Sequence, residues 1–367
     1  MLFLLCTVGL LYIVAGYPLL LALQARFRPQ PTQTGALQPS VSVLLPVHNG
    51  ERWIESKLAS IFSLDYPQEK MQVLVIADGC TDQTAAIASR FPVEVITLQE
   101  KSGKAVALNR AMEQARGEIL FFTDVRQPLG RDALQQLINR FADPRVGVVT
   151  GELVILDGTT QEEVNVGLYW KYEKWIRKHL SLVDSVLGAT GCIYAMRRSL
   201  TKPLPAGTLL DDVHLPMQAF FAGYRIVMEE RAKAYDPPTG LGAEFWRKVR
   251  TQAGIYQLLG HFPALLWPGT RMWIHFVSYK FGRLMLPFLL IGIGVGACLL
   301  PTPWKSITLA AQGLFYLFAI GNRWIPANAG ILKKVSAAAS AFVVLVGAAL
   351  CAAGVLFIPA KLFWRTR

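Results

Sequence analysis

The stretch Glu118-Ile-Leu-Phe-Phe-Thr-Asp-Val-Arg-Gln-Pro128 decides the fold predicted for this chain. Its apolar run, 119–123, has the length and character of a strand buried on both faces. Asp124 follows, just where the chain must turn. In open α/β sheets, ligands bind at the carboxyl ends of the strands, so Asp124 is well placed for a phosphate-bound metal or a ribose. The structural alternative is a turn-capping Asp before Pro128.

Three more short apolar runs precede this one and alternate with helical patterns. Strands are expected at 41–45, 73–77 and 93–98, and helices at about 51–62, 81–90 and 104–115. Repeated strand-helix-strand units predict a doubly wound, Rossmann-like α/β sheet. His48, Asp78 and Asp124 each follow such a strand, so these three side chains are expected to converge on one edge of the sheet.

The composition indicates a membrane protein. Of the 367 residues, 53% are hydrophobic, and the mean hydropathy is +0.35, which is too apolar for an ordinary soluble enzyme. The net charge is +12, with the basic residues beside apolar and aromatic stretches. This pattern favours anionic lipid headgroups and anionic substrates as partners over nucleic acid. The five cysteines are scattered and show neither metal spacing nor a disulfide framework.

The first membrane segment is predicted at the N-terminus. Residues 2–23 carry no charge and are long enough to cross a bilayer, and Arg26 and Arg28 follow at once. We therefore expect a transmembrane anchor at 1–25, with the following chain in the cytosol. A cleaved signal peptide is the alternative, although no basic residue precedes the apolar run. A polar linker over 26–40 comes next.

The C-terminal third is expected to return to the membrane. Apolar runs lie at about 275–300, 307–320 and 335–358, the middle one short for a full crossing, so about three helices are expected in 274–360. Residues 243–273 mix Arg, Lys and aromatic side chains as interfacial helices do. The positive-inside rule agrees with Arg323, Lys333 and Lys334 but conflicts with the basic tail 361–367, which leaves the topology there open.

Two groups of charged residues fit a group-transfer reaction. Asp211 and Asp212 could supply the carboxylate that accepts a proton from an attacking sugar hydroxyl. Adjacent acids at a helix N-terminus, which favour the macrodipole, are the structural alternative. Lys104 and Arg250 could neutralise a diphosphate leaving group. Taken alone, either side chain is more often a solvated surface charge.

Four segments in order resemble the donor-site motifs of family 2 glycosyltransferases. They are Val41-Ser-Val-Leu-Leu-Pro-Val-His-Asn-Gly50, Val75-Ile-Ala-Asp-Gly-Cys-Thr-Asp-Gln-Thr84, Gly103-Lys-Ala-Val-Ala-Leu-Asn109 and Gly117-Glu-Ile-Leu-Phe-Phe-Thr-Asp124. The resemblance extends over roughly 41–259, and the membrane flanks place it near the membrane-integrated synthases of cellulose, chitin and hyaluronan. It implies a GT-A domain over 41–242 and inverting transfer from a nucleotide sugar, usually a UDP-sugar.

The resemblance also implies roles for the donor-binding residues. Pro46 and His48 match the segment that lines the base, where the family usually has Tyr in the place of His48. Asp78 matches the second acid of the Asp-Asp-Gly motif that holds the base, and Ala77 replaces the first. Lys104 matches the lysine beside the donor.

The acid motif departs from the family pattern. Asp124 matches the first acid of the Asp-x-Asp motif, but Arg126 stands where the family has the metal-binding second acid. An Arg cannot ligate Mg²⁺ or Mn²⁺, which take oxygen ligands. Either Asp124 and the diphosphate hold a divalent cation with another ligand, for which His214 is a candidate, or Arg126 takes over part of the phosphate charge. A retained Mg²⁺ or Mn²⁺ is the expectation.

The acceptor side is also implied by the resemblance. The pair Asp211-Asp212 matches the family's acceptor motif, which makes Asp212 the candidate general base. Arg247-Lys-Val-Arg-Thr251 stands in the place of the Gln-x-x-Arg-Trp motif. Arg250 is kept there for the diphosphate, while Thr251 lacks the aromatic platform of processive synthases.

Two further residues are expected near the acceptor. Trp170 could stack on a sugar, and Gly191 lies near the acceptor end by its position in the family. The structural alternatives are an aromatic core residue and a tight turn.

These observations predict an integral membrane protein, in a bacterial inner membrane, whose cytosolic domain adds sugars to a surface polysaccharide or glycolipid. Its expected partners are the nucleotide-sugar donor, the polysaccharide or lipid acceptor, the lipid bilayer and proteins of exopolysaccharide export. Two alternatives stay open. One is a non-processive enzyme acting on a lipid acceptor, and the other is a catalytically degenerate subunit of an exopolysaccharide assembly.

Overall fold

The computed structural model describes residues 1–156, 161–236, 241–326 and 328–363, without the side chains of 161–170, 241–244 and 360–361. The chain divides into two compact units. We call Arg28–Leu156 with Arg177–Pro237 the sheet unit, and Met1–Phe27, Asp157–Ile176 and Pro238–Arg367 the helical unit. Helix α7 (Gln161–Val183) contributes residues to both units.

The sheet unit is built around a seven-stranded mixed sheet, with the strand order β3-β2-β1-β4-β6-β5-β7. The strands are β1 (Val41–Val47), β2 (Met71–Asp78), β3 (Glu94–Leu98), β4 (Ile119–Phe122), β5 (Val146–Ile155), β6 (Tyr194–Arg197) and β7 (Arg225–Asp236). Strands β1 to β4 pair in parallel, as do β5 and β7. Strand β6 runs antiparallel to β4 and β5. The four predicted strands are confirmed, and the antiparallel insertion of β6 was not predicted.

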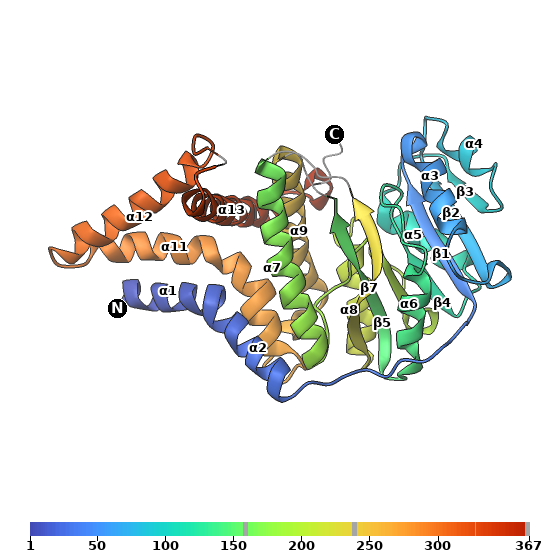
Figure 1. Cartoon of the computed structure of the whole chain (residues 1–367), viewed down its shortest axis with the longest axis horizontal. Coiled ribbons are helices and arrows are strands. Elements are labelled where there is room, and N and C mark those ends of the chain that lie inside the picture. The colour runs from blue at the N-terminus through green and yellow to red at the C-terminus, as the bar shows by residue number, and fades with distance from the viewer. Residues whose placement is uncertain (157–160, 237–240, 327, 364–367) are drawn as a thin grey trace. The chain divides into compact units, whose positions relative to one another are not determined.

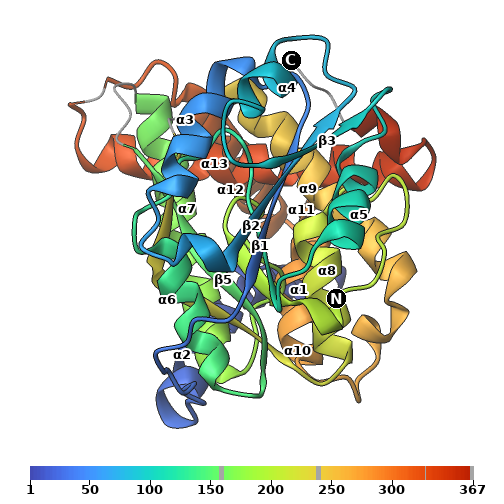
Figure 2. The ribbon, with the colours of Figure 1, turned by 90° about the vertical axis from the view of Figure 1, so that its right-hand side faces the viewer.

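Helices cover both faces of this sheet. They are α3 (Glu51–Phe62), α4 (Thr84–Ala88), α5 (Lys104–Gln114), α6 (Ala133–Asn139) and α8 (Asp211–Phe221), with 3₁₀ turns at Gln68–Lys70, Arg140–Ala142 and Arg198–Leu200. Figure 2 shows α3 and α6 on one side of the strands and α5 and α8 on the other. Strands β1 and β4 and most of β2 are therefore buried on both faces, as predicted. The expectation of burial is wrong for β3, whose residues are exposed or half-buried because it forms the edge of the sheet.

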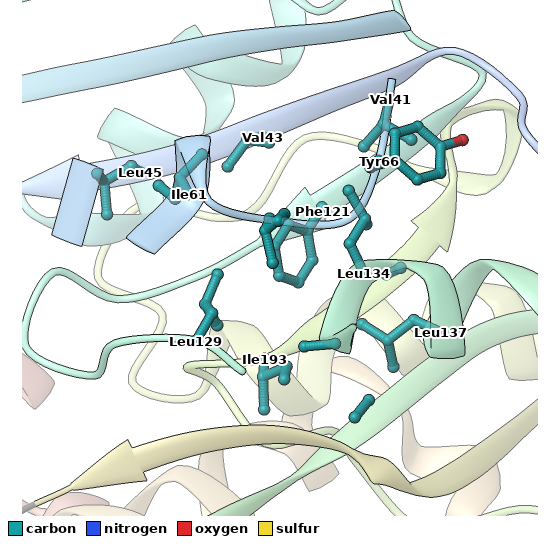
Figure 3. Close-up of a cluster of buried hydrophobic side chains, with 14 of the residues drawn as sticks. Val41, Val43, Leu45, Ile61, Tyr66, Phe121, Leu129, Leu134, Leu137 and Ile193 are labelled. Carbon is teal, nitrogen blue, oxygen red and sulfur yellow. The ribbon is translucent and has the colours of Figure 1, made fainter. Parts of the chain in front are cut away.

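The core of the sheet unit follows the two-residue period of its strands. Val41, Val43 and Leu45 point to one face of β1, where they join Phe121 of β4 and residues of α3 and α6 in one hydrophobic cluster. Figure 3 shows Leu134 of α6 in this cluster together with Phe121. The cluster holds the carboxyl ends of β1, β2 and β4 in register, which fixes the edge that carries the polar residues.

The helical unit contains the two N-terminal helices and the helices that follow β7. They are α1 (Leu2–Leu11), α2 (Tyr17–Phe27), α9 (Leu241–His261), α10 (Trp273–His275), α11 (Gly282–Cys298), α12 (Trp304–Gly321) and α13 (Ile331–Ala352). Single π-helical turns, Tyr12–Gly16 and Phe276–Phe281, join α1 to α2 and α10 to α11, and 3₁₀ turns lie at Pro263–Leu266, Ala353–Leu356 and Ala360–Phe363. Helix α1 packs against α11, and α13 packs against α9 and α12. Figure 1 shows α1 and α11 side by side.

Three helical stretches in the described ranges are long and apolar enough to cross a membrane: Leu2–Phe27, Trp273–Cys298 and Ile331–Leu356. The first overlaps the predicted anchor at 1–25 from residue 2 on. The other two overlap the first and third of the predicted C-terminal runs. Helix α12 forms from the middle run but is not among the stretches that qualify. A third C-terminal crossing, the interfacial role of 243–273 and the domain boundaries stay predictions, and the charged tail residues 364–367 lie outside the described residues.

Candidate active site

The carboxyl edge of the parallel strands carries the three residues that the sequence placed there. His48 follows β1, Asp78 is the last residue of β2, and Asp124 comes two residues after β4. The Nδ1 atom of His48 lies 2.7 Å from the backbone oxygen of Asp78. A carbonyl oxygen only accepts, so Nδ1 carries the proton and donates. Pro46 lies on β1 in register with Ile76 of β2. The predicted convergence on one edge is confirmed.

The Asp78 carboxylate organises the loop before α5. Its Oδ1 accepts a hydrogen bond of 2.7 Å from the amide of Ser102, and its Oδ2 accepts one of 2.9 Å from the amide of Gly103. Gly79, with φ +56°, fits the same turn because an added Cβ would lie 2.2 Å from the backbone nitrogen of Lys101. Asp78 thus positions Lys104 one residue beyond this loop, and its contact with a nucleotide base stays a prediction.

Lys104 connects two of the predicted acids. Its Nζ lies 3.0 Å from Oδ1 of Asp124 and 3.1 Å from Oδ2 of Asp211. Burial disfavours the charge on Lys104, but Asp124, Asp211 and Asp212 outweigh it, so the pKa of this lysine lies well above its ordinary value. A permanently charged ammonium therefore joins the acid of the donor edge to the acid pair of α8.

The acid pair begins helix α8. Asp211 is buried, and the backbone oxygen of Asp212 accepts a hydrogen bond from the amide of Ala189 at 2.7 Å. A Cβ added to Gly191 would lie 3.1 Å from Oδ2 of Asp212, so the absence of a side chain at Gly191 leaves room beside this carboxylate. Both acids lie in the first turn of the helix, where the macrodipole also favours them. The geometry thus agrees with both interpretations that the sequence left open.

Lys57 is a part of the site region that the sequence did not reveal. Its side chain is fully buried, and its Nζ donates hydrogen bonds to Oγ1 of Thr123 at 2.7 Å and to the backbone oxygen of Gln127 at 2.5 Å. Thr123 donates in turn to the backbone oxygen of Cys192 at 2.8 Å. Lys57 therefore holds both ends of the turn that carries Asp124 and ties it to the segment before β6.

A signal for Lys57 was present in the sequence. The lysine lies on the same helix face as Ile54, Leu58 and Ile61, all of which are buried. A charged residue within an apolar stripe of helical period needs a buried partner. Burial lowers the pKa of Lys57 to about 7, although Cys192 and Asp124 act in the opposite direction.

Arg126 is paired with an acid that the sequence analysis missed. Its Nη2 lies 2.7 Å from Oδ2 of Asp236, the last residue of β7, and Nε2 of Gln127 donates to the same oxygen at 3.0 Å. Asp236 is buried. Because Asp236 is more than a hundred residues away in sequence, no local pattern could have indicated this pair.

The residues at the acid motif do not fit a divalent cation in the way that the family pattern implies. Within the described ranges, no group of three or more His, Cys, Asp or Glu side chains is placed to hold a metal ion, and His214 belongs to no such group. Lys104 contacts one oxygen of Asp124, and the side chain at the second motif position is a cation. A cation held with the help of the diphosphate stays a prediction.

Two predicted site residues cannot be placed in this region. The side chain of Trp170 lies outside the described residues. Arg250 lies on α9 in the helical unit, so its contact with a diphosphate stays a prediction.

Comparison with known proteins agrees with this fold. Residues 42–204 match the model of the family described as glycosyl transferase family 2. The poly-beta-1,6-N-acetyl-D-glucosamine synthase of Staphylococcus aureus strain COL is 26% identical over 229 residues, 60% of this chain, and the synthase of the same name from Staphylococcus epidermidis is 25% identical over the same length. The chain spans 55% of the length of these relatives.

A solved structure shares the fold of nearly the whole chain. It is a mannosyltransferase from Pyrobaculum calidifontis in complex with GDP-Man and Mn²⁺, with a TM-score of 0.70 and 22% identity, covering 93% of this chain and 98% of that one. At this identity the likeness concerns the fold alone.

The fold is therefore that of the GT-A glycosyltransferases. Residues 42–204 form a glycosyl transferase family 2 domain, and the chain is similar in sequence to polysaccharide synthases. Helical stretches near both ends of the chain are long and apolar enough to span a membrane. The family resemblance of the four sequence motifs is thereby confirmed.

Proposed function

We propose that this protein is a membrane-embedded, inverting glycosyltransferase that transfers a sugar from a nucleotide sugar, a UDP-sugar in our reading, to a growing surface polysaccharide or glycolipid. The supporting observation is the Lys104 ammonium, which lies 3.0 Å from Asp124 at the donor edge and 3.1 Å from Asp211 on α8. One fixed cation thus lies between the residues assigned to the donor and those assigned to the acceptor.

The reaction follows from these positions. The Asp212 carboxylate accepts the proton of the acceptor hydroxyl while the oxygen of that hydroxyl attacks the anomeric carbon of the donor. The bond from that carbon to the diphosphate oxygen breaks, and the electron pair leaves with the nucleoside diphosphate. Because the hydroxyl attacks the face of the anomeric carbon opposite the diphosphate, the configuration at that carbon is inverted. Lys104 offsets the negative charge that develops on the leaving diphosphate.

The setting is the cytosolic face of a bacterial inner membrane, where nucleotide sugars are available. The three stretches able to cross a membrane support this location, and Arg26, in the last turn of the first of them, supports the orientation. Proteins that export an exopolysaccharide are the expected partners of a synthase in this position.

Purified full-length protein in detergent micelles, offered a panel of nucleotide sugars, should release nucleoside diphosphate from one of them. No release from any donor, with or without Mn²⁺, contradicts the proposed function. Release without a sugar-containing product would indicate hydrolysis alone.

The Asp212→Asn variant separates the two interpretations of the acid pair. As the general base, Asp212 should contribute about 100-fold or more to turnover, and the variant should still bind the nucleotide. As a helix-end acid, its loss should cost only about 0.3–1 kcal/mol of stability and leave turnover intact. Asp65→Asn is the matched control, because Asp65 lies in an exposed ion pair with Arg131.

A non-processive enzyme acting on a lipid acceptor is the second candidate. Thr251 stands where processive synthases have an aromatic platform, and its hydroxyl donates to the backbone oxygen of Arg247 on its own helix at 2.9 Å. Sizing the product decides between the two: a single added sugar supports the lipid acceptor, and a ladder or polymer supports a synthase. Nucleotide binding without turnover, even with export partners present, would instead support a degenerate subunit.

A further inference from the structure

The Arg126 guanidinium is held from one side and open on the other. Its side chain is 36% exposed, whereas that of its partner Asp236 is 3% exposed. In the part of the chain that the structure describes, Asp236 is its one hydrogen-bond partner, and a guanidinium has five N–H donors. A buried carboxylate thus orients this cation while most of its donors stay available at the surface.

The residues that hold Arg126 are themselves restrained by hydrogen bonds. The oxygen of Asp236 that binds Arg126 also accepts the amide of Gln127 at 3.0 Å, and the backbone oxygen of Gln127 accepts the Lys57 ammonium at 2.5 Å. Because Gln127 follows Arg126 in the chain, these contacts restrain the turn directly behind the guanidinium. Arg126 is therefore preorganised, which reduces the entropy lost when it binds a ligand.

Arg126 also lies in a particular place. It is two residues from Asp124, whose Oδ1 contacts Lys104 at 3.0 Å. Lys104 therefore contacts the acid after β4, and Arg126 follows that acid by two positions in the chain, where the family has a metal-binding carboxylate. A guanidinium matches the geometry of phosphate oxygens and can donate two parallel hydrogen bonds to them.

We propose that Arg126, oriented by Asp236 and acting with Lys104, binds the donor diphosphate directly and neutralises the charge that a divalent cation neutralises in family members with a complete acid motif. Nucleotide binding by this protein therefore needs no metal. This inference rests on the proposed function, because it concerns the donor of that reaction.

A purely structural ion pair between the turn and β7 is the rival explanation, and nucleotide binding distinguishes the two. Full-length protein purified in EDTA is titrated with UDP and with GDP by calorimetry, first in EDTA and then in excess Mn²⁺. We expect one of them to bind in EDTA with an affinity within about threefold of that in Mn²⁺. Losing a charged hydrogen bond costs about 1.5–3 kcal/mol, so Arg126→Ala should weaken binding by about 10- to 100-fold.

Three further variants control this result. Arg131→Ala removes an exposed arginine whose Nη2 lies 3.6 Å from Asp65, and it should bind as the wild type does. Arg126→Lys keeps the charge but loses the fork of donors, so its affinity should fall between those of the wild type and the alanine variant. Arg126→Asp recreates the family's pair of acids, and its nucleotide binding should become dependent on Mn²⁺. Thermal unfolding of each variant shows whether it is folded.

The outcomes separate this inference from the proposed function. Wild-type binding that requires Mn²⁺, or an Arg126→Ala variant that is folded and binds as the wild type does, overturns the inference and leaves the glycosyltransferase intact. Absence of nucleoside diphosphate release from every donor overturns the function, and the titration in EDTA still decides the inference. If neither UDP nor GDP binds under either condition, the inference is overturned, and the donor panel decides the function separately.

Discussion

Two arginine-carboxylate pairs, one in each unit, have the same distance between nitrogen and oxygen but different surroundings. In the helical unit, Nη2 of Arg283 lies 2.7 Å from Oε2 of Glu173, and both side chains are 11% exposed. In the sheet unit, Nη2 of Arg126 lies 2.7 Å from Oδ2 of Asp236, but the arginine is 36% exposed. The distance between the two atoms therefore does not show whether both partners are buried or whether the arginine is accessible to solvent.

The surroundings explain the difference. The Arg283 guanidinium lies 4.2 Å from the centre of the Tyr279 ring, and the hydroxyl of Tyr279 donates to the other oxygen of Glu173. Both partners are thus enclosed, and the pair links α7 to α11. Arg126 has no such cover in the described part of the chain, because it lies on the turn after β4. A pair with both partners buried contributes to folding stability. A pair whose arginine is partly exposed can also bind a ligand.

The largest expected effect comes from breaking the enclosed pair. Glu173→Gln would leave the Arg283 charge buried without its carboxylate, which costs about 3–5 kcal/mol of folding stability. Thermal unfolding in detergent should show a large fall in the melting temperature. Glu230→Gln is the matched control, because Glu230 forms an exposed pair with Lys178 at 2.9 Å. A melting temperature like that of the control would show that the pair is not enclosed.

A smaller loss of folding stability is expected when the pair between Arg126 and Asp236 is broken in the same way. Asp236→Asn removes the carboxylate from Arg126, but water can solvate the exposed guanidinium, so the cost should be about 1–2 kcal/mol. The larger consequence should be weaker nucleotide binding, since the guanidinium loses its orientation. If Asp236→Asn destabilised the protein more than Glu173→Gln, the contrast between the pairs would be wrong.

The third expected effect is a pH dependence that concerns Lys57, a buried cation near Arg126 whose two hydrogen-bond acceptors are uncharged. Burial lowers its pKa from 10.5 to about 7. The unfolded chain therefore binds more protons than the folded chain between about pH 7 and 10.5, and stability should rise with pH in this window. The slope is at most about 1.4 kcal/mol per pH unit.

This pH dependence is measured against Lys57→Met, which does not titrate. The melting temperature of the wild type minus that of the variant should increase from pH 7 to 9. The same difference taken with Lys202→Met is the control, because the Lys202 side chain is exposed. A constant difference for Lys57→Met would show that the lysine keeps its ordinary pKa.

Much of the donor edge could be predicted from local patterns. Helix α3 spans Glu51–Phe62, as its apolar period predicted, and the strands that end near His48, Asp78 and Asp124 were found from their short apolar runs. The parallel register of β1 with β2 and β4 then brings these ends together. Each of these inferences rests on neighbours in sequence, where side-chain period and turn chemistry operate.

The sequence by itself determined the family resemblance of the motifs, the parallel part of the sheet, the apolar stretches and the unusual Arg126 two positions after Asp124. Only the tertiary structure decided what Arg126 contacts, because Asp236 reaches it through the pairing of β5 with β7 and the insertion of β6 between β4 and β5. The same holds for Lys104, which meets Asp211 across the fold. Local patterns specify elements, whereas ion pairs between distant residues depend on how the elements pack.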